Sequence, residues 1–154
     1  GSYTGLRVGL ALAKGIALAQ KLPLIGVPTL DIVAAAVPRL ETDLVVLAQA
    51  GRTRLWAGQY SWNGKQGWEP VGDPMLTQWE DLLSRLQVPV AFAGEIDATA
   101  AKLIRRVNRS AHIVGPAASV RRAGVLAEIG WGRWKKQQVT EADALAPLYL
   151  REPG

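Results

Sequence analysis

The first part of the chain, residues 3–20, is an apolar, glycine-containing segment that restricts the possible folds more than any other feature. Its apolar residues recur with the helical period of about 3.6 residues, which predicts a helix over this range. Two apolar strips run along this helix, one made by Gly5, Gly9, Leu12 and Ile16 and the other by Leu6, Leu10, Ala13 and Ala17. Arg7 and Lys14 form a narrow polar stripe with Lys21. Such a helix needs cover on more than one side.

The two apolar strips have two interpretations, and the sequence leaves both open. In the first, the helix lies deep in the core of its own domain. In the second, one face packs on its own sheet and the other binds a partner protein. Glycine inside a helix costs about 1 kcal/mol relative to alanine. We therefore expect a neighbouring backbone to approach closely at Gly5 and Gly9.

The composition is that of a globular chain of one domain. The chain has 154 residues, of which 49% are hydrophobic and 20% charged, and these proportions exclude a disordered protein. We expect neither a membrane span nor a signal peptide, because basic residues interrupt the first apolar run and no charged segment precedes it. The chain has no cysteine, which excludes disulfides and thiolate metal sites and fits the reducing cytoplasm, where we expect the protein.

The net charge of +5 is unevenly distributed. Residues 1–100 hold 8 basic and 9 acidic side chains, whereas residues 101–154 hold 10 basic and 4 acidic ones. The carboxy-terminal third therefore carries the whole excess, which makes an anionic partner worth considering.

The order of predicted elements indicates an α/β fold with a mixed β-sheet flanked by helices. Helices are expected over residues 3–20, 30–37, 77–86, 97–107 and 118–134, the last fraying at Gly130 and Gly132. Strands are expected over residues 23–28, 43–51, 53–62, 68–72, 89–95 and 111–116. Thr77 and Asp97 are the predicted caps of the helices that follow them.

The opening residues also carry a specific motif. The stretch GSYTGLRVG, with the later Lys14-Gly15 and PLIGVPTLD, resembles the signature of the TsaB (YeaZ) family, Gly-Pro-Gly-Ser-Phe/Tyr-Thr-Gly-Leu-Arg-Ile/Val-Gly. The matching residues are Gly1, Ser2, Tyr3, Thr4, Gly5, Leu6, Arg7 and Gly9. The closing segment APLYLR (residues 146–151) is similar to the usual ending of the family. The resemblance covers both ends of the chain, while the middle agrees mainly in pattern.

This resemblance implies an actin/Hsp70-like (RNase H-like) fold of two subdomains. Family members carry a further amino-terminal portion, with several strands and a long helix, before the motif. We therefore expect this chain to be a fragment. Residues 1–36 would be the remnant of the first subdomain, with a helix, a short strand and a connecting helix, and residues 37–154 the second α/β subdomain.

The resemblance also implies a function. TsaB is a non-catalytic, glycoprotease-like protein that helps to make threonylcarbamoyladenosine in tRNA, and the related subunit TsaD carries the metal, the ATP or ADP and the catalysis. For this chain it implies no cofactor and no metal, a TsaD-like and a TsaE-like ATPase partner, homodimerisation, indirect contact with tRNA and no membrane association. The residues expected to bind the partner are Leu6, Leu10, Ala13, Lys14 and Ala17.

The residues themselves agree with a lack of catalysis. His112 is the only histidine, so paired histidines for a glycoprotease metal site are missing. Glu95 and Asp97 are spaced for a strand end and a helix cap, although the same spacing also fits an acid pair in a cleft. A residual glycoprotease-like or ATPase-like enzyme therefore stays as a minor hypothesis.

Two sites for anion binding are predicted, one at the N–H groups that begin the first helix and one at the basic side chains of the carboxy-terminal third. Ser2, Thr4 and Arg7 lie where a helix amino terminus attracts phosphate or nucleotide, but a cap made by Ser2 or Thr4 explains the same residues. RNA contacts are possible at Arg105, Arg106, Arg109, Arg133, Lys135 and Lys136, with Trp131 and Trp134 available for stacking. The alternative is a solvated helix face. For Trp56, Trp62, Trp68 and Trp79 we expect packing in or beside the core.

Overall fold

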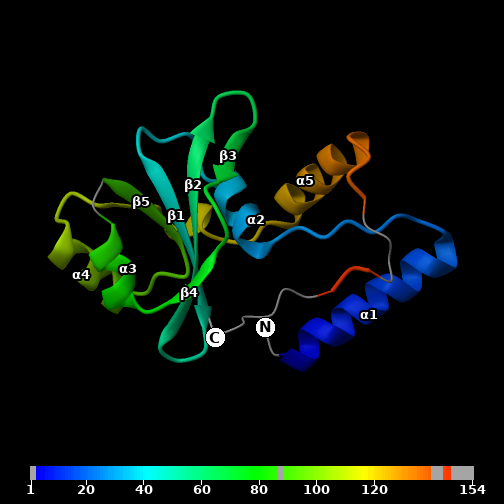
Figure 1. The fold of residues 1–154 in the computed structure, drawn as a ribbon, viewed down its shortest axis with the longest axis horizontal. Helices are drawn as coiled ribbons and strands as arrows, with labels where there is room; N and C mark the ends of the chain where they lie inside the picture. Colours follow the sequence, from blue (N-terminus) through cyan, green and yellow to red (C-terminus); the bar gives the residue numbers. More distant parts are fainter. Residues whose placement is uncertain (1–2, 87–88, 140–143, 147–154) are drawn as a thin grey trace. The chain divides into compact units, whose positions relative to one another are not determined.

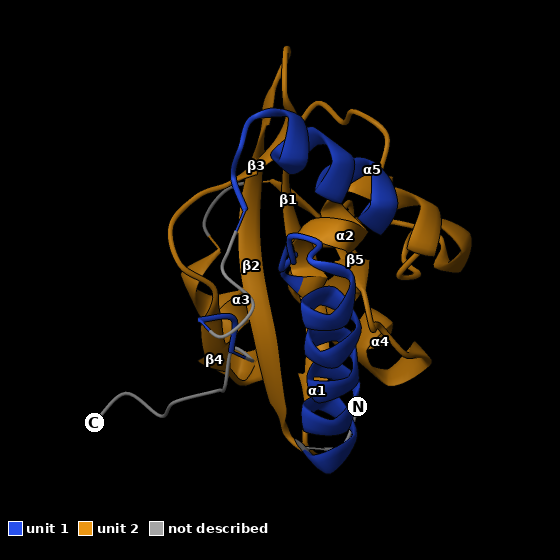
Figure 2. Ribbon diagram, turned by 90° about the vertical axis from the view of Figure 1, so that its right-hand side faces the viewer, with its two compact units in different colours: residues 1–28, 126–149 blue, residues 29–125, 150–154 orange. Residues whose placement is uncertain are grey.

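The computed structural model describes residues 3–86, 89–139 and 144–146. The chain divides into two compact units (Figure 2). Unit 1 comprises residues 1–28 and 126–149, and unit 2 comprises residues 29–125 and 150–154. No helix within the described ranges is both long and apolar enough to cross a membrane.

A mixed β-sheet forms the centre of unit 2. Its strands are β1 (Asp43–Ala50), β2 (Arg54–Asn63), β3 (Gly67–Pro70), β4 (Met75–Thr77), β5 (Val90–Gly94) and β6 (His112–Ile113). The order is β3-β2-β1-β5-β6, and β4 also pairs with β2. The pairs of β2 with β1, β3 and β4 are antiparallel, whereas β1 with β5 and β5 with β6 are parallel. The predicted mixed sheet is therefore confirmed.

Helices cover both faces of this sheet (Figure 1). Helix α2 (Thr29–Ala36) packs on one face, and α3 (Trp79–Arg85) and α4 (Ala98–Val107) pack on the other. Successive side chains of a strand point to opposite faces. Thus Leu44 and Val46 of β1 join the cluster beneath α2, and Val45 and Leu47 join the cluster beneath α3 and α4. Strand β1 is buried on both sides, which explains its nearly continuous apolar sequence.

The tryptophans of unit 2 pack as predicted. Trp68 is buried, and its indole N–H donates a hydrogen bond of 2.9 Å to the Val37 carbonyl oxygen. Trp62 meets Trp68 edge-on, with ring centroids 5.3 Å apart and planes at 82°. Trp56 and Trp62 pack beside the cluster beneath α2, and Trp79 beside the other.

Unit 1 contains the predicted opening helix, α1 (Tyr3–Gln20), and most of α5 (Ala123–Lys135). Helix α1 ends where Lys21 adopts a left-handed backbone conformation with φ of 52°. The Lys21 N–H then donates to the Leu18 carbonyl at 3.2 Å and the Leu22 N–H to the Ala17 carbonyl at 2.9 Å. This pair of bonds is the Schellman motif, which satisfies carbonyls at a helix end.

Helix α5 ends in the same way. Gln137 has φ of 58°, and its N–H donates to the Trp134 carbonyl at 2.9 Å. The Gln138 N–H donates to the Arg133 carbonyl, also at 2.9 Å. Both helices of unit 1 therefore stop at a defined residue, although neither has the glycine that usually occupies this position.

The structure corrects two predicted features in the first half of the chain and adds one strand that was not predicted. Residues 23–28 form no regular strand, and only Leu24 makes a bridge. Pro23 and Pro28 lack an N–H, so this segment offers few donors to a sheet. The strand β4 was not predicted. It contains Thr77, so the predicted cap of α3 is wrong: the cap position is Gln78, which makes no side-chain bond to the helix.

Two further corrections concern the second half, where the cap at Asp97 is confirmed. The Asp97 carboxylate accepts a 2.7 Å hydrogen bond from the Ala100 N–H. The predicted strand over residues 111–116 contains only His112–Ile113, because the chain turns into a short 3₁₀ helix at Pro116–Ala118. Helix α5 begins at Ala123 rather than 118 and runs unbroken through Gly130 and Gly132.

Candidate functional site

Helix α1 exposes most of its large apolar side chains. Leu6, Val8, Leu12, Ile16 and Leu18 are between 50% and 67% exposed. Single exposed apolar residues are common, but a contiguous apolar patch on a surface marks an interaction site. The row Val8, Leu12 and Ile16 has the i, i+4, i+8 spacing that places side chains on one helix face. This row is the candidate binding surface.

The residues predicted to bind a partner lie on a different face and become less exposed along the helix. Leu6 is exposed, Leu10, Ala13 and Lys14 are half-buried, and Ala17 is buried. The exposed row includes Val8, which sequence reasoning did not select, and Leu12 and Ile16, which it placed on the glycine face. The sequence did contain an indication of this second surface, because apolar residues lie on most sides of the helix. A Cβ added at Gly9 would meet no atom within 4 Å, so the close backbone approach expected at Gly9 is wrong and this side of the helix is open.

The residues predicted to bind an anion lie at the start of α1. Ser2 lies outside the described residues, and Thr4 and Arg7 are exposed. Because α1 already includes Tyr3, Thr4 is inside the helix and does not cap it. Anion binding by these residues stays a prediction.

The residues predicted to contact RNA are divided between the two units. Arg105 and Arg106, in the last turn of α4, and the following Arg109 are exposed on unit 2. Arg133 in unit 1 is half-buried, and its Nη1 donates a 2.6 Å hydrogen bond to the Gly26 carbonyl oxygen. Lys135 and Lys136 are exposed at the end of α5.

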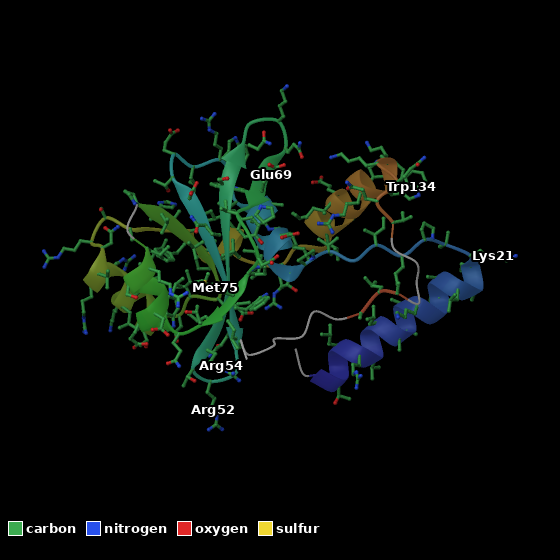
Figure 3. The ribbon with its side chains drawn as sticks, viewed as in Figure 1. Lys21, Arg52, Arg54, Glu69, Met75 and Trp134 are labelled. Atoms are coloured by element: carbon green, nitrogen blue, oxygen red, sulfur yellow. The ribbon has the colours of Figure 1, made fainter. Side chains whose placement is uncertain are left out.

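Unit 2 also contains a cleft of about 740 Å³ beside the carboxyl ends of the parallel strands β1, β5 and β6. In open α/β sheets this edge is the usual place for ligands. The cleft has an apolar lining that includes Leu47, Leu55 and Ile113. Arg52 and Arg54, which also line it, belong to the turn and strand that follow β1 (Figure 3).

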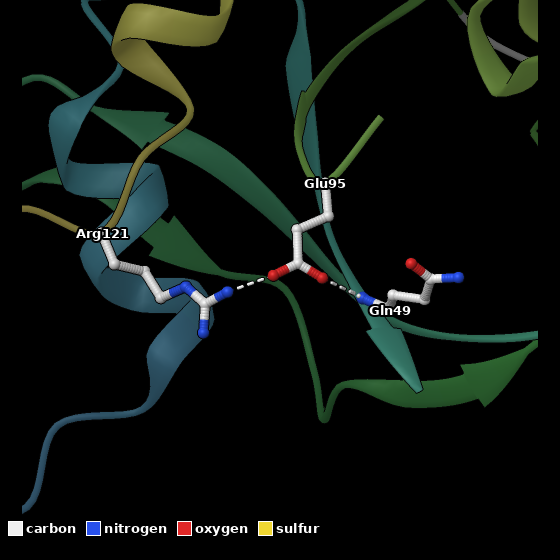
Figure 4. Close-up of polar contacts among 3 residues, drawn as sticks. All are labelled: Gln49, Glu95 and Arg121. Atoms are coloured by element: carbon white, nitrogen blue, oxygen red, sulfur yellow. Dashed lines mark hydrogen bonds and ion pairs between the residues drawn. The ribbon is translucent and has the colours of Figure 1, made fainter. Parts of the chain in front are cut away.

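Glu95 is the central acid of this cleft, and it is engaged on both oxygens (Figure 4). One oxygen accepts a hydrogen bond from the Gln49 N–H at 2.7 Å, and the other pairs with the Arg121 guanidinium. The preceding Gly94 has φ of +103°, and a Cβ there would overlap the Leu47 carbonyl oxygen. With Asp97 acting as a cap, both carboxylates have structural partners. This arrangement explains their spacing without a catalytic acid pair.

Metal-binding chemistry has little support among the side chains that the structure describes. They include no group of three or more His, Cys, Asp or Glu residues able to hold an ion. His112 is exposed on the short strand β6, where it pairs through its backbone with Ala91.

Comparison with known proteins decides the family. A profile of the family described as "TsaD: tRNA N6-adenosine threonylcarbamoyltransferase" matches residues 1–151. The chain belongs to the TsaD family. The chain is also 29% identical over 154 residues to the tRNA threonylcarbamoyladenosine biosynthesis protein TsaB of Bacillus subtilis. The match covers 98% of this chain but only 66% of the length of that curated relative.

Two solved structures have a similar fold. One is a Pseudomonas aeruginosa protein described as similar to peptidase YEAZ, with a TM-score of 0.74 and 22% identity over 98% of this chain and 69% of that one. Another is YeaZ from Pseudomonas aeruginosa, with a TM-score of 0.74 and 21% identity over 97% and 70% of the two chains. The TsaB/YeaZ resemblance and the actin/Hsp70-like fold that it implied are thereby confirmed.

Proposed function

We propose that this chain is part of a non-catalytic partner subunit for the enzyme that installs threonylcarbamoyl on adenosine in tRNA. The family match and the TsaB relative support the pathway. The observation that carries the partner role is the exposed apolar surface of α1. Its proposed occupant is a TsaD-type catalytic subunit.

The physical basis for docking at α1 is the apolar area that the helix leaves in water. Burial of a Val, Leu or Ile side chain contributes about 1.5–3 kcal/mol. Val8, Leu12 and Ile16 are 63%, 65% and 55% exposed, so more than half of this gain is left for a partner to supply at each position. A surface without charge specificity also accepts a second copy of this chain, so homodimerisation through α1 competes with docking of the catalytic subunit.

Three finer features belong to the same proposal. A TsaE-like ATPase joins the complex, and the complex works in the cytoplasm. ATP or ADP and the metal stay with the catalytic subunit, because Glu95 and Asp97 are already engaged within unit 2. Residues 1–36 belong to a first subdomain and residues 37–154 to a second one, a division based on the family resemblance.

The test is a binding titration between this chain and its cognate TsaD-type subunit, measured by isothermal calorimetry. Leu12→Glu, which places a charge in the centre of the exposed row, is expected to raise the Kd at least about tenfold. Val107→Glu is the matched control, because Val107 is similarly exposed but lies in unit 2. Leu6→Glu tests the other apolar strip. Unchanged affinity for both α1 variants would contradict the proposal.

The rival enzymatic function has a direct test of its own. Purified chain is assayed alone for ATP hydrolysis and for metal-dependent proteolysis. We expect neither activity. If the chain hydrolysed ATP or cut protein, and Glu95→Gln abolished that activity, a catalytic role would be favoured over the partner role.

A further inference from the structure

The carboxyl-terminal end of α5, with the residue that follows it, carries an exposed aromatic and basic surface that docking at α1 does not use. It consists of Trp131, Trp134, Lys135 and Lys136, all in unit 1, and is called the tryptophan platform below. The two indoles are 57% and 47% exposed. Figure 3 labels Trp134 at this end of the helix.

The indoles are ordered against each other. Their ring centroids lie 4.7 Å apart with planes at 26°, a stacked arrangement. The Lys135 ammonium lies 5.8 Å from the centroid of the Trp131 ring, within the range of a cation–π contact. Trp134 and Lys135 lie at i+3 and i+4 from Trp131, which places these three side chains on one side of the helix, and Lys136 is the residue that follows the helix. The platform is therefore a flat aromatic surface with a cation beside it.

The Schellman motif at Gln137 holds this surface in place. The carbonyl that accepts the Gln137 N–H belongs to Trp134 itself. Arg133, the neighbouring basic residue, is excluded from the surface because its guanidinium donates to the Gly26 carbonyl. That bond ties the last turn of α5 to the loop after α1, and both belong to unit 1.

Helix stability accounts for only part of the platform. Lysines near a helix carboxyl end interact favourably with the helix dipole, by about 0.3–1 kcal/mol each. This explains Lys135 and Lys136 but not two large indoles left in water. Aromatic rings that stack with bases, next to cations that meet phosphates, are the combination with which proteins bind unpaired nucleic acid.

We propose that the tryptophan platform binds an unpaired RNA segment, with a base stacked on the indole pair and phosphates contacted by Lys135 and Lys136. The choice of RNA rests on the proposed function, since the family acts on tRNA. It also fits the charge of residues 101–154, which hold 10 basic and 4 acidic side chains. An acidic protein partner would need the lysines but not the flat aromatic surface.

The test is fluorescence polarisation with the whole chain and a labelled unpaired oligoribonucleotide, compared with an RNA duplex of equal length. We expect preference for the single strand. Trp134→Ala is expected to raise the Kd at least about fivefold, since one stacked base contributes about 1–3 kcal/mol. Trp134→Phe, which keeps an aromatic face, should restore most of the affinity. Thermal unfolding of each variant serves as the control for folding.

The charge contribution is measured separately. Lys135→Gln with Lys136→Gln should lower the slope of log affinity against log salt by about 1.4, because each phosphate contact on single strands contributes about 0.7. Lys65→Gln with Lys102→Gln is the matched control, at two exposed lysines of unit 2. It should leave both affinity and slope unchanged.

Two results would overturn the proposal. One is equal affinity of Trp134→Ala and the unchanged chain for the single strand. The other is loss of binding to the catalytic subunit in Trp134→Ala, in a chain that binds no RNA, which would make the platform a protein contact. Leu12→Glu separates this test from the test of the proposed function, because it should lose the catalytic subunit and keep the RNA.

Discussion

Unit 2 and unit 1 differ in how they treat their apolar side chains. In unit 2 the sheet is covered on both faces, and Leu44, Val46, Leu47 and Ile104 are almost completely buried. In unit 1, α1 has only Ala17 buried among its described side chains, and α5 has none. Both units contain regular, well-ended helices. Regular secondary structure and burial are therefore separate properties in this chain.

This difference in burial indicates a different role for each unit. Unit 2 buries its apolar residues against its own elements, so packing within the chain supplies its stability. The helices of unit 1 end at backbone motifs and leave apolar and aromatic groups in water. Burial of these groups becomes favourable to the molecule only when another molecule covers them and removes them from water. The predictions below test this contrast, starting from the largest expected effect.

The largest effect is expected from the same substitution made in each unit. Leu47→Ala removes a buried side chain between β1 and the helices α3 and α4 and should lower the free energy of unfolding by about 2–5 kcal/mol. Leu12→Ala, on α1, should change it by less than about 0.5 kcal/mol, as for other exposed residues. Both are measured by urea denaturation. Similar losses in the two variants would show that α1 is covered in solution.

A second prediction concerns the tight backbone contact between β1 and β5. Gly94→Ala forces a side chain into a left-handed conformation with φ of +103° and onto the Leu47 carbonyl. Strain of this kind costs about 1–3 kcal/mol before the overlap is relieved. Chemical denaturation measures the loss. Stability equal to that of the unchanged chain would mean that the end of β5 can move away from Leu47 without cost.

A third prediction concerns a polar contact inside unit 2 and its dependence on pH. The Tyr60 hydroxyl donates a 2.9 Å hydrogen bond to the Asp31 carboxylate. Burial, and then the charge and the hydrogen bond of Asp31, raise the pKa of Tyr60 above its usual value of 10.0. The folded state therefore holds this proton more tightly, so the stabilisation is complete below pH 10.0 and is lost as the pH rises above it.

Tyr60→Phe tests this contact. It removes the donor and leaves the carboxylate, so it should lower stability by about 1–2 kcal/mol near neutral pH. The difference from the unchanged chain should shrink in alkaline solution. The measurement is urea denaturation at several pH values, and a difference that grows above pH 10.0 would refute the assignment.

The smallest effect is expected in α1 and has the opposite sign. Gly9→Ala adds a methyl group where no atom lies within 4 Å. Alanine favours a helix over glycine by about 1 kcal/mol, so helix content by circular dichroism should rise. Gly15→Ala, with the same open surroundings, is the matched control and should behave alike. A loss of helix in Gly9→Ala alone would indicate a close contact at that position in solution.

Much of unit 2 could be predicted because its pattern is local. The strand-like runs DLVVLAQA and TRLWAGQYSW predicted β1 and β2, and Asp97 predicted the start of α4 through a cap that needs only nearby residues. Strand β4 could not be predicted in this way. It has three residues, and it is a strand only because Leu76 pairs with the distant Trp56. Pairing between distant segments leaves no local pattern.

The candidate site was predicted in part. The apolar excess of α1 pointed to a binding helix, but the choice between its two strips depended on which face the rest of the chain covers. Which face is covered depends on tertiary packing, and in the structure Ala17 is buried whereas Leu12 is exposed. The stacking of Trp131 and Trp134 was likewise visible only as a spacing of three residues, until side-chain rotamers placed the rings together.

The position of β1 has a consequence for the order of folding. Val46 of β1 pairs with Gly58 of β2, the next strand in the sequence. It also pairs with Ala93 of β5, which follows α3 in the sequence. A hairpin forms in about 1–10 μs, whereas contacts between distant segments form slowly. The β1–β2 hairpin should therefore exist first and serve as the template for β5. Refolding of unit 2 is then limited by the docking of a parallel strand onto a preformed antiparallel ribbon.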